Sequence, residues 1–142
     1  MKKTKGFTLL EVLVTLVIMS FGLLGIAGII VNSLKNNQSS YARSQASWLG
    51  NDIIERMRAN RGTAEIAPSP YNLALGTDPT GAGVAPDDLT QWRTALASTL
   101  PSGTGSVVLN AVTNTVTIVV QWDDSHATSG SSVQSITVET RL

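Results

Sequence analysis

The sequence predicts an α+β fold in which one long N-terminal helix packs on a small antiparallel β-sheet. Three patterns indicate this architecture. Residues 12–34 form an apolar run of 23 residues without a charge. Helical spacing of apolar residues then continues to about residue 60, and the last third of the chain alternates apolar and polar residues as strands do. The chain has 142 residues, which leaves enough sequence after the apolar run for one small domain.

The apolar run is long enough to cross a membrane. At about 1.5 Å per residue, a helix of this length spans the roughly 30 Å hydrocarbon core of a bilayer. Lys2, Lys3 and Lys5 precede the run, and we expect them to stay on the cytoplasmic side. A cleaved secretory signal peptide fits less well, because its apolar region is normally about 7–15 residues long.

Glu11 separates two further interpretations of this segment. A plain single-pass anchor explains the lysines and the length of the run, but it does not explain an acid at its beginning. A carboxylate is unfavourable in a membrane, by about 2.5–3.5 kcal/mol at the helix centre on insertion scales. Such a residue is therefore expected to have a partner and a function.

Beyond Lys35 the chain is expected to continue as an amphipathic helix. Apolar residues recur there at intervals of three or four and mark the face that packs on a globular domain: Ala42, Ala46, Leu49, Ile53 and Met57. The simplest interpretation is one helix from about Thr8 to about Asn60, which is about 80 Å long. Arg61 and Gly62 carry the usual signals of a helix end.

A loop and a second, shorter helix are expected next. Residues 62–86 are rich in Gly, Pro, Ala, Thr and Ser and show no periodicity. Asp88 is predicted to be the N-cap of the short helix, with Gln91 three residues later in a capping-box arrangement. One face of this helix is apolar, and a proline ends it: Leu89, Trp92, Leu96, Leu100 and Pro101.

The remaining residues predict about three strands. The expected order is a turn or loop at 102–105, a strand at 107–112, a hairpin turn at Thr113–Asn114, a strand at 115–122, a polar loop at 123–132 and a last strand at 134–142. The inward side chains of the last two strands are expected to be Val116, Ile118, Val120, Trp122, Ile136 and Val138.

Composition and motifs predict a protein that is not an enzyme and holds no metal or cofactor. The chain has no cysteine, which excludes disulfides and thiolate sites. Its 10 basic and 10 acidic residues form no basic stripe, so no nucleic-acid binding is indicated. No phosphate loop, nucleophile elbow or zinc spacing occurs. His126 lies near Asp123 and Asp124, a group able to hold a cation, but a solvated loop is the preferred interpretation.

Residues Gly6 to Glu11 resemble the class III signal of type IV pilins and related pseudopilins. The resemblance implies that prepilin peptidase, a membrane aspartic peptidase, cuts between Gly6 and Phe7 and methylates the new amine of Phe7. It divides the chain into a leader at 1–6, a membrane-spanning and assembly half of the helix at 7–34, and a periplasmic globular domain at 35–142. We expect the Glu11 carboxylate to pair with the Phe7 amine of a neighbouring subunit, because an unpaired charge in an apolar bundle costs several kcal/mol.

Residues 36–46 and 52–61 resemble the PilV family of minor type IV pilins. The resemblance implies a low-abundance subunit that joins other minor pilins and the major pilin, initiates pilus assembly and presents a PilY-type tip adhesin. Adhesion and twitching motility would follow. The subunit would be held in the inner membrane with its N-terminus in the cytoplasm and its domain in the periplasm, and would then enter the pilus at the cell surface. The alternative is a minor pseudopilin of a type II secretion system.

The charged cluster and the glycines of the long helix can each be interpreted in two ways. The charged cluster of the helix is either a solvated face or a docking face for a neighbouring minor pilin; its members are Asp52, Glu55, Arg56, Arg58 and Arg61. Asp52 and Arg56 are spaced as an ion pair within the helix. Gly22, Gly25 and Gly28 either allow close helix packing or make it easier for this part of the helix to lose its helical form in a filament, as the resemblance implies.

Overall fold

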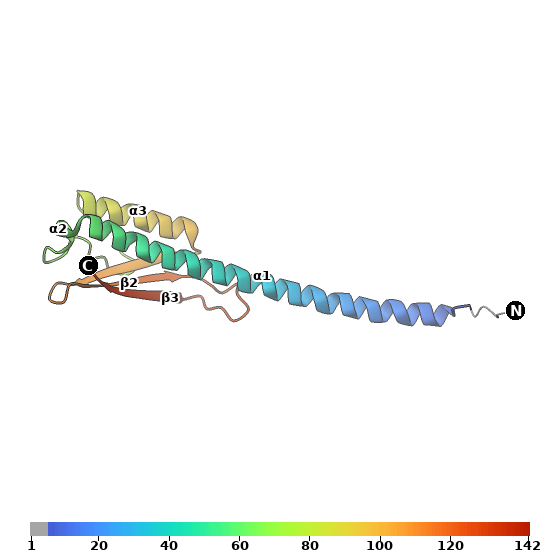
Figure 1. Cartoon of the computed structure of the whole chain (residues 1–142). Helices are drawn as coiled ribbons and strands as arrows, with labels where there is room; N and C mark the ends of the chain where they lie inside the picture. Colours follow the sequence, from blue (N-terminus) through green and yellow to red (C-terminus); the bar gives the residue numbers. More distant parts are fainter. Residues whose placement is uncertain (1–5) are drawn as a thin grey trace.

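The computed structural model describes residues 6–142. The predicted positions of Lys2, Lys3 and Lys5 therefore lie outside the described residues. The elements in chain order are α1 (Leu9–Ala59), α2 (Arg61–Ala64), α3 (Val84–Thr99), β1 (Thr104–Asn110), β2 (Thr115–Trp122) and β3 (Gln134–Arg141). Figure 1 shows a long rod with a small domain at its C-terminal end, as the sequence predicts.

Helix α1 is continuous over 51 residues. Thr8 caps its first turn and Asn60 its last, so both predicted ends are confirmed. The first half projects from the domain with its large apolar side chains exposed. The three glycines of this half are helical, and open space surrounds them.

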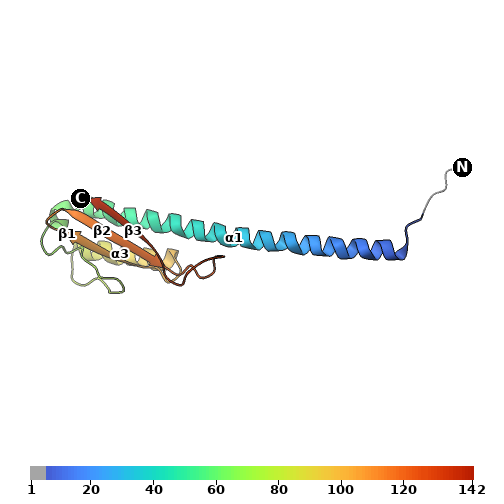
Figure 2. The same ribbon diagram turned by 90° about the horizontal axis from the view of Figure 1, so that it is seen from below.

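The three strands form one antiparallel sheet in the order β1-β2-β3 (Figure 2). Val107 of β1 lies opposite Ile118 of β2, which lies opposite Val138 of β3. The central strand has the predicted bounds, and its four predicted inward residues are buried. The corresponding residues of β3 are half-buried and pack against the core.

The core lies between the sheet and the two longer helices, which cover the same face of the sheet. Helix α1 contributes its predicted stripe, of which Leu49, Ile53 and Met57 are almost fully buried. Helix α3 contributes Trp92, whose indole N–H donates a hydrogen bond of 2.8 Å to the carbonyl oxygen of Leu49. The Leu49 carbonyl lies within α1 and accepts this further bond from α3. The bond therefore holds the two helices side by side.

The predicted start of α3 is wrong, and one short helix was not predicted. Asp88 is not an N-cap, because α3 begins at Val84 after Gly83, whose φ of 118° suits glycine. Pro86 fits within this first turn, where a backbone N–H has no helical partner. The end of α1 near Asn60 is as predicted, but Arg61 and Gly62 begin α2, a single further turn, where a loop was expected.

Strand β1 also differs from its prediction. It begins at Thr104 and ends at Asn110, whereas residues 107–112 were expected. Gly105 therefore belongs to the strand rather than to a turn, and a Cβ atom there would lie 2.5 Å from Cη2 of Trp92. In the sequence Gly105 suggests a turn. In the structure its missing side chain lets β1 approach the buried indole of Trp92 closely.

Candidate functional site

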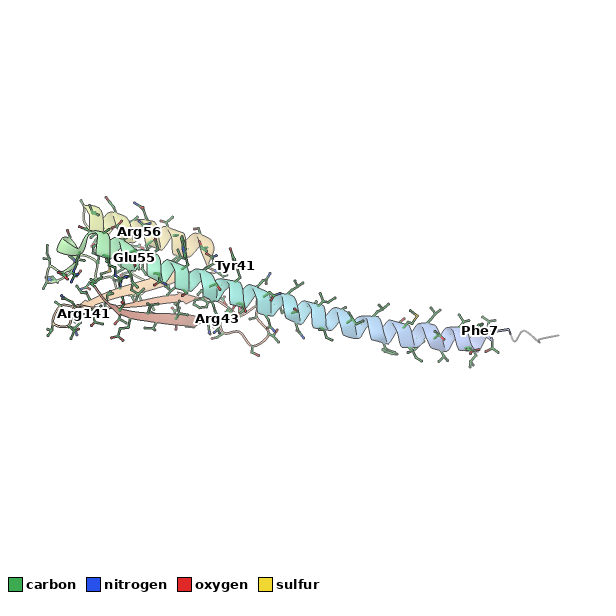
Figure 3. The ribbon with its side chains drawn as sticks, viewed as in Figure 1. Phe7, Tyr41, Arg43, Glu55, Arg56 and Arg141 are labelled. Atoms are coloured by element: carbon green, nitrogen blue, oxygen red, sulfur yellow. The ribbon has the colours of Figure 1, made fainter. Side chains whose placement is uncertain are left out.

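The N-terminal end of the described chain is accessible. Gly6, Phe7 and Thr8 precede the helix and are not helical. The side chain of Phe7 is 83% exposed, and Figure 3 shows it at the end of the molecule remote from the domain. The bond between Gly6 and Phe7 therefore lies in an exposed, non-helical segment, which a peptidase can bind.

Thr8 and Glu11 form the N-terminal cap of α1. The Thr8 hydroxyl oxygen accepts a hydrogen bond of 3.3 Å from the backbone N–H of Glu11. Thr-x-x-Glu is the spacing of a capping box, of which the bond from the backbone N–H of Glu11 to Thr8 is present. The positive end of the helix dipole also favours a carboxylate in this turn. The Glu11 carboxylate thus favours helix initiation through the dipole, in addition to any role between subunits.

The Glu11 carboxylate has no ion-pair partner among residues 6–142. Its residue is exposed and lines a shallow recess together with Phe7 and Val12. The acid and the first residue after the Gly6–Phe7 bond therefore lie at the same end of the rod. This arrangement leaves the carboxylate available to a positive group on another molecule.

Helix α1 is long and apolar enough to cross a membrane. Its most apolar window of 18 residues has a mean hydropathy of 2.5 and is not buried by any part of the described chain. The core helix of a soluble protein would instead be covered by its own fold. The apolar half thus requires lipid or other protein chains around it.

The chain carries the prokaryotic N-terminal methylation motif. The family defined by this motif matches residues 1–27, which include the Gly6–Phe7 bond and Glu11. The motif supports a type IV pilin-like or pseudopilin protein that is processed by prepilin peptidase and associates with the membrane for assembly. Such a protein is structural and is not an enzyme. No curated protein and no solved structure matches the chain.

The charged cluster of this pilin-like protein makes many bonds within its own chain. Nε of Arg56 lies 2.9 Å from Asp52, so the predicted pair within the helix is confirmed. Nη1 of Arg56 lies 3.3 Å from Asp88 and 3.0 Å from Gln91, both on α3. Burial lowers the pKa of Arg56, but hydrogen bonds and charges of the two aspartates outweigh it and raise this pKa above its ordinary value.

Asp88 also anchors the loop between α2 and α3. The fully buried Tyr71 donates a hydrogen bond of 2.6 Å from its hydroxyl to Oδ2 of Asp88 and accepts one of 3.1 Å from Asn60. Burial, and then the bond to Asp88, raises the pKa of Tyr71 to about 12. Arg56, Asp88, Tyr71 and Asn60 therefore join the end of α1 to α3 and to the loop between them.

The other charged residues of the cluster, Glu55, Arg58 and Arg61, have side chains more exposed than that of Arg56. Nη1 of Arg58 lies 2.6 Å from Glu55, and Nη2 lies 3.4 Å from the carbonyl oxygen of Arg141 in β3. Arg61 pairs with Glu65 at 2.7 Å. The side chains of Glu55, Arg58 and Arg61 remain 66%, 43% and 56% exposed, so a partner can still contact them.

The loop after β2 has a defined structure. Asp124 is buried and accepts a hydrogen bond of 2.6 Å from the hydroxyl of Ser39 on α1. Asp123 accepts one of 2.9 Å from the backbone N–H of Ser125, which lowers the pKa of Asp123. Within the described residues no three His, Cys, Asp or Glu side chains are grouped closely enough to hold a metal ion. The two aspartates therefore act in the loop and in its attachment to α1.

Proposed function

We propose that this protein is a minor pilin of a type IV pilus. It is held in the inner membrane with its N-terminus in the cytoplasm, is cut after Gly6, is methylated at Phe7 and helps to initiate the filament. Its domain joins other minor pilins and presents a PilY-type tip adhesin, which supports adhesion and twitching motility. The similarity of residues 36–46 and 52–61 to PilV proteins favours this role over that of a minor pseudopilin in a type II secretion system.

The observation that carries the proposal is the carboxylate of Glu11, which has no ion-pair partner among residues 6–142 and lies at the same end of the rod as the Gly6–Phe7 bond. Cleavage would create a positive amine on Phe7, at the same end of the apolar rod. In a bundle of such rods, each amine would be neutralised by the Glu11 of a neighbour, and a slipped register would leave both charges unpaired. The pair would thus select the correct register, since an unpaired charge in an apolar bundle costs several kcal/mol.

Because Glu11 also lies in a helix cap, its two roles must be separated. We expect Glu11→Leu to be cleaved and methylated but to be absent from assembled filaments. Thr8→Ala removes the 3.3 Å capping bond but keeps the carboxylate, so it should assemble. Intact-mass analysis of the membrane and filament fractions distinguishes them. Normal incorporation of Glu11→Leu would contradict the pairing, and loss of Thr8→Ala to the same degree would assign the effect to the helix cap.

The filament system is tested by deleting the gene and counting surface pili, with retraction intact and with retraction blocked. A minor pilin that initiates assembly predicts loss of pili that return when retraction is blocked. Unchanged pili, together with exported enzymes trapped in the periplasm, would instead assign the protein to type II secretion.

We further propose that the exposed charges of the cluster contact a neighbouring minor pilin. Arg61 suits the test, because its only charged partner among the described residues is Glu65, on its own turn of helix. Arg61→Glu should reduce co-purification with the other minor pilins. Arg43→Glu is the control, since Arg43 is an exposed arginine of α1 outside the cluster. Equal co-purification of both variants would indicate that the cluster is a solvated face and not a docking face.

A further inference from the structure

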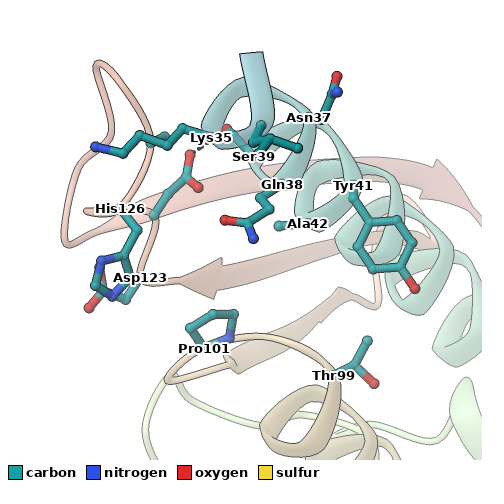
Figure 4. Close-up of a pocket in the computed structure, with 13 residues that line it drawn as sticks. Lys35, Asn37, Gln38, Ser39, Tyr41, Ala42, Thr99, Pro101, Asp123 and His126 are labelled. Carbon is teal, nitrogen blue, oxygen red and sulfur yellow. Dashed lines mark hydrogen bonds between the residues drawn. The ribbon is translucent and has the colours of Figure 1, made fainter. Parts of the chain in front are cut away.

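A cleft of about 670 Å³ lies where the apolar rod enters the domain. One wall is α1 between Leu34 and Ala42. The opposite wall is formed by Thr99 and Pro101 at the end of α3 and by the loop that follows β2 (Figure 4). A volume of this size is typical of pockets that bind small molecules.

The position of the cleft places it at the membrane surface. Leu34 is the last residue of the uncharged run, and Ala42 lies about 12 Å farther along the helix. The headgroup layer of a bilayer is roughly 5–8 Å thick on each side. In the membrane-held subunit the mouth of the cleft therefore opens at the level of the headgroups. Its helical wall is continuous with the lipid-facing surface of α1. Tyr41, which is 64% exposed on this wall, suits such an interface.

The charges of the cleft have a definite arrangement. Lys35 is exposed on the helical wall and has no ion-pair partner among residues 6–142. Asp123 lines the cleft from the loop wall and, like an ordinary aspartate, is ionised at neutral pH. Asp124 is occupied by Ser39, and His126 is exposed at the rim. Lys35 and Asp123 thus stand on opposite walls, with His126 beside Asp123, and most of the exposed surface of the cleft is apolar. Oδ1 of Asp123 accepts the bond from Ser125, and its second oxygen remains for a ligand.

We propose that this cleft binds one phospholipid whose headgroup carries both a phosphate and a primary ammonium, as phosphatidylethanolamine does. Lys35 pairs with the phosphate, Asp123 accepts hydrogen bonds from the ammonium, and the apolar walls cover the first part of an acyl chain. A purely anionic headgroup is disfavoured by the aspartate, and a choline headgroup has no N–H to donate to it. The proposal requires only the membrane-held subunit, so it holds for a pilus subunit and for a secretion pseudopilin.

Native mass spectrometry of the full chain in detergent tests the proposal, with phosphatidylethanolamine, phosphatidylcholine or phosphatidylglycerol added. We expect phosphatidylethanolamine to be retained most strongly. Lys35→Glu should reduce its retention about tenfold, because charge-assisted bonds of this kind contribute that much. Asp123→Asn keeps an oxygen for the Ser125 N–H and should abolish the preference over phosphatidylcholine. Thr99→Trp, which fills the cleft from an exposed position, should remove the bound lipid.

Arg43→Glu is the matched control, because Arg43 is an exposed cation of the same helix that does not line the cleft. It should retain the lipid as the unmodified chain does. Equal retention of the three lipids, or retention unaffected by Lys35→Glu and Thr99→Trp, would overturn the proposal and assign the lipid to the apolar rod alone. A cross-link from the single cysteine of Thr99→Cys to a second protein chain in membranes, in place of lipid, would assign the cleft to a neighbouring subunit. Processing after Gly6 is scored separately by mass, so failure of the lipid site leaves the proposed function intact.

Discussion

Removing the hydroxyl of Tyr71 tests the network that joins the end of α1 to α3. In Tyr71→Phe, Asp88 loses the 2.6 Å hydrogen bond and keeps only Arg56, while the Asn60 amide loses the acceptor at 3.1 Å. A hydrogen bond to a charged group contributes about 1.5–3 kcal/mol. The ring itself remains, so no cavity adds to this cost. We expect the free energy of unfolding to fall by about 2 kcal/mol, which for a domain of this size lowers Tm on the order of 10 °C.

The pH dependence gives this prediction a second readout. The pKa of Tyr71 is about 12 in the folded protein, against 10.0 for an ordinary tyrosine. A pKa that is higher in the folded state stabilises the fold fully below the unfolded value. This stabilisation is lost as the pH rises through the folded value. The difference between the unmodified chain and Tyr71→Phe should therefore be complete at neutral pH and should shrink between pH 10 and about 12.

Thermal unfolding of the full chain in detergent, followed by near-ultraviolet circular dichroism, measures both effects. Tyr41→Phe is the control, because Tyr41 is 64% exposed and its hydroxyl makes no hydrogen bond within the described residues. This variant should match the unmodified chain at every pH. A difference below about 0.5 kcal/mol for Tyr71→Phe, within the range of neutral surface changes, or a difference that stays constant to pH 12, would refute the reasoning.

Three other substitutions are expected to change stability in stated directions, and the same unfolding assay measures each. Gly50→Ala should raise the free energy of unfolding by about 1 kcal/mol, because alanine favours helix. The new Cβ would lie at an ordinary 3.5 Å from its nearest neighbour, a methyl group of β3. A destabilised variant would contradict this. Gly105→Ala should destabilise by about 1–3 kcal/mol, since its Cβ would lie 2.5 Å from Trp92; an unchanged Tm would show that the strand can shift. Ser39→Ala should lose about 1.5–3 kcal/mol with the bond to Asp124, and hydrogen exchange of the loop after β2 should increase; unchanged exchange would mean that the loop is held by other bonds.

The elements with a strong local pattern were predictable from the sequence. Strand β2 alternates four apolar residues between a hairpin turn and a polar loop, so its bounds at Thr115 and Trp122 follow from period-two patterning. Helix α1 was predictable because its apolar face recurs at helical spacing up to Met57 and no proline interrupts it. Cleavage between Gly6 and Phe7 stays a prediction, which depends on a motif of consecutive residues; the match of residues 1–27 supports the motif itself.

Long-range contacts decide the features that were not predictable. Asp88 has the spacing of a helix cap, but Tyr71 and Arg56 bind its carboxylate from segments 17 and 32 residues away. Gly105 suggests a turn until Trp92 is known to lie against it. The lipid cleft draws its walls from three segments that no local pattern connects. Glu11 is different, because its capping spacing with Thr8 was present in the sequence.

The two halves of α1 separate folding from assembly. From Phe7 to Leu34 the apolar side chains make no part of the core, whereas the second half supplies the stripe that packs on the sheet. The free energy of burying the first half is therefore obtained from its surroundings and not from the fold. Lipid and the apolar helices of neighbouring subunits provide similar apolar environments, so the rod can pass from one to the other without unfolding the domain. Glu11 and the proposed lipid cleft lie at the two ends of this rod. The apolar side chains between them fit lipid and protein equally well, whereas the charged groups at the two ends favour one environment over the other.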